Sequence, residues 1–110
     1  MKMKEYHKLI RDRIGEVIVK EGRIPVLRTL DKDEYIIELK KKLLEEVDEF
    51  LVAPSESVIE EMADVYEVLE HLQEAFGINK EDLLVVKAKK AQIKGKFKKR
   101  LFLVGVKDKE

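Results

Sequence analysis

The fold is decided by residues 32–76, which read KDEYIIELKKKLLEEVDEFLVAPSESVIEEMADVYEVLEHLQEAF. In the first half of this stretch, apolar side chains recur at the steps of one helical face, namely at Ile36, Leu39, Leu43, Val47 and Phe50. The second half has the same spacing at Val58, Met62, Val65, Leu69, Leu72 and Phe76. This periodicity predicts two long helices, over residues 32–53 and 56–76, each with one apolar face.

The residues at the helix ends fit these bounds. Asp31 is expected to cap the start of the first helix, and Pro54 ends it because proline cannot continue a helix. Ser55 or Ser57 is the expected N-cap of the second helix, and Gly77 follows its C-terminus. Because the connection is short, we expect the two helices to form an antiparallel hairpin.

A third helix is predicted further along the chain. It should begin after Asn79, whose side chain is expected to cap the amide of Asp82, and end near Gly95. Its apolar face carries Leu83, Val86 and Ile93.

The N-terminal part has a less regular pattern. Ile14, Val17 and Ile18 suit a short helix ended by Gly22, while segments near residues 25–28 and 97–104 are predicted to be extended. We therefore expect a mainly all-α fold, in which the antiparallel hairpin and the third helix form an oligomeric helical bundle. The whole chain, residues 1–110, is predicted to be a single domain.

The composition excludes several classes of protein and of site. Apolar runs are too short for a membrane span or a secretory signal, so a cytoplasmic protein with no membrane partner is expected. The absence of cysteine excludes disulfides and thiolate zinc sites. Hydrophobic residues make up 45% of the chain and the net charge is zero, which permits a buried core. Abundant Glu and Lys with few labile residues suggest a thermophile.

Charge is strongly segregated although the net charge is zero. Residues 31–74 carry 15 acidic and 4 basic side chains, whereas residues 80–110 carry 11 basic and 4 acidic ones. The basic end, with Phe97 and Phe102 among its lysines, leaves a nucleic-acid binder as one alternative. Because the acidic middle would repel a polyanion, we expect no nucleic-acid partner.

Two acidic pairs interrupt the apolar faces of the hairpin. Glu46 and Glu49 on the first helix, and Glu61 and Asp64 on the second, are expected to face the seam between the helices. Four carboxylates in a partly dry seam repel one another, so a cation is expected there. Oxygen ligands without His or Cys favour Mg²⁺ or Mn²⁺, and Mg²⁺ is commonly shared with substrate phosphates. The alternative is a pair of solvated helix faces, since glutamates at this spacing also occur by chance.

The candidate catalytic residue is Glu45, which directly precedes Glu46 in the sequence and would orient or deprotonate a water.

Two basic clusters could supply the phosphate contacts of such a site. The predicted phosphate-binding residues are Lys87, Lys90 and Lys94 on the third helix and Lys8, Arg11 and Arg13 near the N-terminus.

The acidic motif resembles a known signature. Glu45-Glu46-x-x-Glu49 followed by Glu61-x-x-Asp64 is similar to the EExxE…ExxD motif of the all-α nucleoside triphosphate pyrophosphohydrolases, the MazG-like and phosphoribosyl-ATP pyrophosphohydrolase-like superfamily. The opening YHKLIRDRI at residues 6–14 and the closing KGKF at residues 94–97 are similar to the YNKLVRDKI and RGGF of one small branch. Three features depart from that branch: the short spacing between the two acidic pairs, Gly15 in place of Pro, and the two lysines of KGKF in place of Arg and Gly.

The resemblance implies a fold, a reaction and an assembly. The implied fold is helical. The implied reaction is Mg²⁺-dependent cleavage of a nucleoside triphosphate, including non-canonical ones, to a monophosphate and pyrophosphate. The implied assembly is a homodimer or higher homo-oligomer. Assembly is also expected from apolar residues outside the main faces, which are Ile37, Leu44, Leu51, Ile59 and Tyr66. A non-catalytic helical interaction module, whose acidic residues are surface charge, remains the alternative function.

Overall fold

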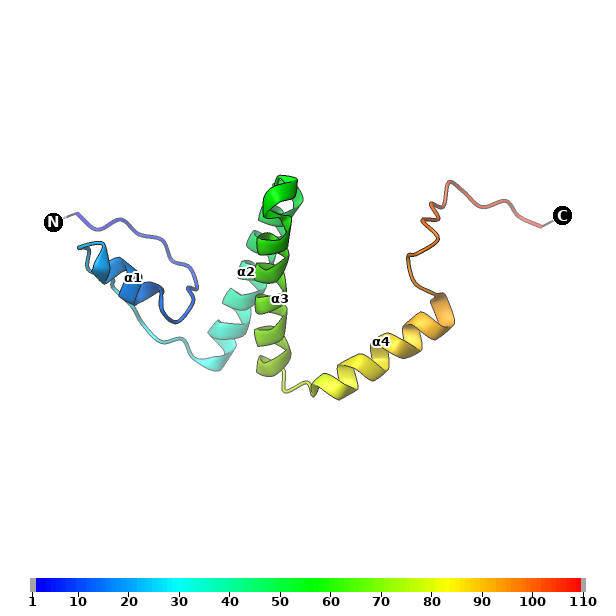
Figure 1. The fold of residues 1–110 in the computed structure, drawn as a ribbon. Coiled ribbons are helices and arrows are strands. Elements are labelled where there is room, and N and C mark those ends of the chain that lie inside the picture. Colours follow the sequence, from blue (N-terminus) through cyan, green and yellow to red (C-terminus); the bar gives the residue numbers. More distant parts are fainter. Residues whose placement is uncertain (1, 110) are drawn as a thin grey trace. The chain divides into compact units, whose positions relative to one another are not determined.

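The structure is a computed structural model that describes residues 2–109. It contains α1 (Ile14–Lys20), α2 (Lys32–Val52), the 3₁₀ helix η1 (Ser55–Ser57), α3 (Val58–Ala75) and α4 (Lys80–Lys94) (Figure 1). Residues 2–109 form no strand, and residues 25–28 and 97–104 lie outside every helix. The predicted all-α fold is therefore confirmed. The predicted extended segment over residues 97–104 is wrong at its start, because residues 97–100 form a turn closed by a 3.2 Å hydrogen bond from the amide of Arg100 to the carbonyl of Phe97. The chain divides into two compact units, one ending at Gly77 and one beginning at Ile78.

The first unit is built on the predicted hairpin. Helices α2 and α3 lie side by side along their length (Figure 1). The side chain of Asp31 accepts a hydrogen bond of 2.9 Å from the amide of Glu34, which confirms the predicted N-cap. Helix α2 ends where Ala53 becomes extended, because the residue before Pro54 is sterically restrained from the helical region.

The start of α3 differs in detail from the prediction. Ser57 occupies the N-cap position, but its side chain caps no amide of the helix. Its hydroxyl instead donates a 3.3 Å hydrogen bond to the carbonyl of Pro54. The intervening turn of 3₁₀ helix brings this hydroxyl over the carbonyl three residues back, and that contact replaces the cap.

The core of the first unit is small. Leu39 of α2 and Val68 and Leu72 of α3 are the buried hydrophobic residues among those described. The partly buried side chains that pack against them are Leu9, Tyr35, Leu43 and Ala75. Through Leu9, the irregular N-terminal segment packs against the hairpin.

The apolar face predicted for α3 is partly wrong. Met62, Leu69 and Phe76 were expected in the core, yet they are 41%, 46% and 52% exposed. The face that α3 turns toward α2 includes Leu72, as predicted, and also Val68, which lies one step round the helix from the predicted face. The apolar arc of α3 is wider than a single neighbouring helix can cover, so part of it faces outward.

The second unit contains α4. Its N-cap is Asn79, as predicted, but the side chain accepts a 2.8 Å hydrogen bond from the amide of Glu81 rather than from Asp82. Gly95 ends the helix with a φ of 80°, which favours glycine. Within residues 2–109, no helix combines the length and apolar character needed to cross a membrane.

Candidate metal centre

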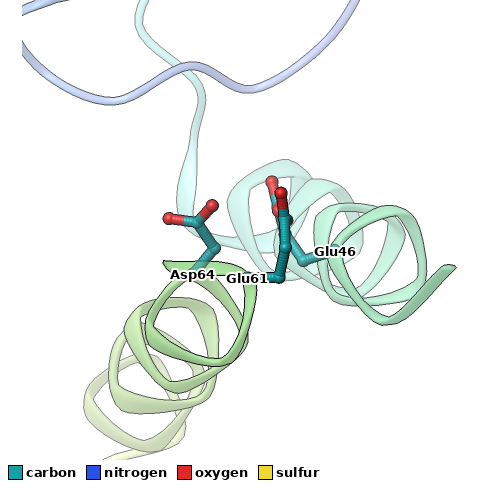
Figure 2. A group of neighbouring side chains, drawn as sticks. All are labelled: Glu46, Glu61 and Asp64. Carbon is teal, nitrogen blue, oxygen red and sulfur yellow. The ribbon is translucent and has the colours of Figure 1, made fainter. Parts of the chain in front are cut away.

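Three of the predicted ligands meet on one side of the hairpin. Glu46 of α2 and Glu61 and Asp64 of α3 each bring a carboxylate oxygen to within 4.8 Å of the other two (Figure 2). The helical repeat explains this arrangement, because Glu46 lies two turns after the buried Leu39 and Glu61 two turns before the buried Val68. The carboxylates therefore emerge from the same faces that form the core.

Two oxygens of this group are buried without a partner. Glu46 is only 8% exposed. Its Oε2 atom and the Oε2 atom of Glu61 are buried and have no hydrogen-bond partner among the residues that the structure describes. A buried carboxylate oxygen without a partner is costly, and a bound cation would satisfy both atoms at once. The donor set of carboxylate oxygens fits a hard divalent ion such as Mg²⁺ or Mn²⁺.

The electrostatics of Glu46 reflect this crowding. Burial is the main cause that raises the pKa of the Glu46 carboxyl, and the nearby charges of Glu49 and Asp64 raise it further. The ammonium group of Lys42 acts in the opposite direction. The ionised form of Glu46 is therefore disfavoured in the folded protein, and a cation beside it would remove that penalty.

Cationic side chains surround the carboxylates. The guanidinium of Arg11 donates a 2.7 Å hydrogen bond from Nη2 to Asp64 Oδ1. The ammonium of Lys42 lies 3.4 Å from Glu45 Oε1 and 3.5 Å from Glu46 Oε1. Lys8 lies 3.8 Å from Glu45 Oε1. The N-terminal segment and α2 thus bring cations to the carboxylates within the first unit.

A cavity of about 250 Å³ opens beside this cluster. Two carboxylates, three cations and two isoleucines line it: Glu46, Asp64, Lys8, Arg11, Lys42, Ile10 and Ile14. A space with both carboxylates and cations in its wall is suited to a divalent ion together with an anionic ligand.

The other predicted site residues lie in different surroundings. Glu49 is exposed and lies outside the group of three carboxylates, although its charge acts on Glu46. Glu45, the predicted catalytic residue, is half-buried between Lys8 and Lys42. Arg13 instead pairs with Glu16 at 3.1 Å, on an exposed surface.

The lysines of α4 belong to the second unit. Lys87, Lys90 and Lys94 are exposed on that helix, and their phosphate-binding role stays a prediction. The sequence interpretation did not include Lys42 among the site residues. Its spacing was the available signal, because a lysine four residues before a buried glutamate lies on the same helical face.

Comparison with known proteins adds one partial match. A protein of Mycolicibacterium smegmatis, named only as an uncharacterized protein, is 56% identical to this chain over 45 residues. The match covers 41% of this chain and 46% of that protein, so the chain spans less than half the length of this relative. No family model matches the chain. No solved structure matches it.

Proposed function

We propose that the chain is a Mg²⁺-dependent nucleoside triphosphate pyrophosphohydrolase, similar to the MazG-like enzymes, that also accepts Mn²⁺. The observation that carries the proposal is the pair of buried, unpartnered oxygens of Glu46 and Glu61 beside Asp64. Glu46 and Asp64 also line a cavity whose wall includes three cationic side chains. Solvated acidic faces would leave such oxygens exposed to water. The substrates would include non-canonical nucleotides.

The residues have complementary roles in this reaction. Glu46, Glu61 and Asp64 would hold the metal, and Glu49, whose charge acts on Glu46, is the proposed fourth ligand. A bound Mg²⁺ would neutralise phosphate charge and lower the pKa of a coordinated water. A water oxygen would bond to the α-phosphorus as the bond from that phosphorus to the oxygen bridging the α- and β-phosphates breaks. The proton of the water would pass to the Glu45 carboxylate, and pyrophosphate and the monophosphate would leave. Glu45 would orient this water, while Lys8 and Arg11 would bind phosphate oxygens.

The test is a panel of canonical, deoxy and damaged nucleoside triphosphates assayed for pyrophosphate release by the full chain. We expect release with Mg²⁺ or Mn²⁺, and none after chelation of the metal. Production of monophosphate in equal amount would establish cleavage at the α-phosphorus. Release of inorganic phosphate alone, or no release from any member of the panel with either metal, would contradict the proposal.

We also propose that the chain forms a homo-oligomer, most simply a two-fold dimer. The hairpin exposes apolar side chains that a monomer leaves in water, including Leu44, Leu51 and Ile59 at 65%, 70% and 79% exposure. A hollow of about 320 Å³ lies between Phe50 of α2 and four side chains of α3, namely Met62, Val65, Tyr66 and Leu69.

The expected result is a mass well above that of one chain. Light scattering at micromolar concentration should give at least twice the monomer mass of 12.9 kDa. Changing Leu51 and Ile59 to lysine should lower the mass, whereas the same change at the solvated Glu56 and Glu70 should leave it unaltered. A mass near that of one chain at this concentration would exclude the assembly.

A non-catalytic helical interaction module is the second candidate function, favoured by the same exposed apolar surface. This module would need only that surface, and the acidic residues would be solvated charge. The two functions differ in their response to metal, because only the enzyme requires a specific Mg²⁺ site. Calorimetric titration with Mg²⁺ that shows no heat of binding would favour the module.

A further inference from the structure

Arg11 is paired with Asp64, a carboxylate that would have to be free in order to bind a metal ion. Its Nη2 atom lies 2.7 Å from Asp64 Oδ1, and Asp64 is one of the three carboxylates whose oxygens converge. The pair is partly open to water, since the Arg11 and Asp64 side chains are 57% and 39% exposed. The carboxylate is thus held by a side chain that solvent can reach and that lies on a segment without regular structure.

The cations already compensate part of the carboxylate charge before any metal binds. Five carboxylates lie in or beside the cluster, and three cations accompany them: Glu45, Glu46, Glu49, Glu61 and Asp64 with Lys8, Arg11 and Lys42. A divalent ion supplies positive charge at the same carboxylates and repels the cations already beside them. A cation paired with a ligand carboxylate is therefore expected to leave when the ion enters.

Arg11 is the cation best placed to leave. Lys42 is held on α2 with only 19% of its side chain exposed, and it keeps Glu45 as a partner when Glu46 binds a metal. Lys8 contacts Glu45, which is not one of the three converging carboxylates. Only the partner of Arg11 is itself a member of that group and half-exposed.

We propose that Arg11 is an exchangeable counter-cation of the metal centre, which a divalent ion displaces from Asp64 and which then binds a phosphate group in the adjoining cavity. This inference rests on the proposed function and adds to it a mechanism that couples the two ligands. Arg11 lines the same cavity as Asp64, so its released guanidinium faces the space that the phosphates would occupy. Metal and phosphate should consequently strengthen each other's binding.

A role for Arg11 in orienting Asp64 would predict the opposite change in metal affinity. If Arg11 served to orient Asp64 as a ligand, its removal would weaken metal binding, as the loss of other supporting hydrogen bonds does. If Arg11 competes with the metal, its removal strengthens metal binding. The sign of the change in affinity therefore decides between the two roles without any measurement of activity.

The experiment is calorimetric titration of the full chain with Mn²⁺ alone, for the wild type, Arg11→Met and Arg28→Met. Arg28 is the matched control, because it also forms an exposed arginine–carboxylate pair, at 2.9 Å from Glu34 Oε2. We expect Arg11→Met to bind Mn²⁺ about fivefold more tightly than the wild type. Arg28→Met should stay within about twofold of it. Arg11→Gln provides a second neutral variant, and thermal melts verify that each variant is folded.

Each result has a defined meaning. Equal or weaker Mn²⁺ binding by both neutral Arg11 variants, relative to Arg28→Met, overturns the exchange while leaving the metal centre in place. No Mn²⁺ binding by the wild type overturns the metal centre, and the exchange with it. In saturating Mg²⁺, magnesium pyrophosphate should bind Arg11→Met at least about fivefold more weakly than the wild type. Unchanged pyrophosphate affinity would exclude the transfer of Arg11 to phosphate.

Discussion

The Asp64→Asn variant is expected to keep its fold and to lose Mg²⁺-dependent pyrophosphate release by at least about 100-fold. Asp64 provides one of the three converging carboxylate oxygens, and the neutral amide of asparagine binds a hard cation much less well. The fold should persist because Asp64 is half-exposed and its charge acts unfavourably on the buried Glu46. The measurement is steady-state pyrophosphate release at several Mg²⁺ concentrations, with circular dichroism to verify folding.

Asp48→Asn is the matched control for this variant. Asp48 is an exposed aspartate on α2 outside the group of converging carboxylates, so the same chemical change should leave turnover near that of the wild type. Raising the Mg²⁺ concentration should recover part of the activity of Asp64→Asn if the loss lies in metal affinity. Wild-type turnover by Asp64→Asn would remove Asp64 from the site.

The Glu46→Gln variant is expected to stabilise the metal-free protein by about 1 kcal/mol at neutral pH. Glutamine keeps the volume of the side chain but removes a buried charge that lies near Glu49 and Asp64. Lys42 is not left without a partner, because it also lies 3.4 Å from Glu45. Mg²⁺ is expected to raise the melting temperature of the wild type, and the same variant should lose this increase, since its folded state would no longer bind the metal preferentially.

The gain from Glu46→Gln should depend on pH. Because burial and neighbouring charges raise the pKa of Glu46 above its usual value of 4.5, ionisation of this residue destabilises the folded state. Below the usual pKa, Glu46 is protonated in both the folded and the unfolded state, and its full contribution to the stability of the folded state is present. That contribution is lost as the pH rises through the raised pKa of the folded state. The difference in free energy of unfolding between Glu46→Gln and the wild type should therefore grow from near zero at about pH 4 to its full size at about pH 8.

Urea unfolding across this range, in the presence of a chelator, measures that difference. Glu70→Gln is the control, because Glu70 is an exposed glutamate on α3 and its replacement should have no comparable pH dependence. A difference between Glu46→Gln and the wild type that shrinks as the pH rises would show that Glu46 is stabilised, not strained, by its surroundings.

Much of the fold could be predicted from local patterns. The bounds of α2 and α4 and the caps at Asp31 and Asn79 follow from residue types at fixed spacings, and the structure reproduces them within one or two residues. The packing face of α3 could not be predicted in the same way. Apolar residues lie around most of that helix, so periodicity alone did not decide which of them would meet α2.

For the site, the sequence by itself predicted four carboxylates at the hairpin seam, of which three converge and Glu49 lies outside the group. Spacing along each helix fixes the face that carries Glu46, Glu61 and Asp64, and the short connection brings those faces together. Only the tertiary structure decided what surrounds them. The pairing of Arg11 with Asp64 joins residues 53 positions apart, and it arises because Leu9 packs into the core and carries the N-terminal segment across the acidic cluster. Such contacts depend on long-range packing of an irregular segment, for which no local period exists in the sequence.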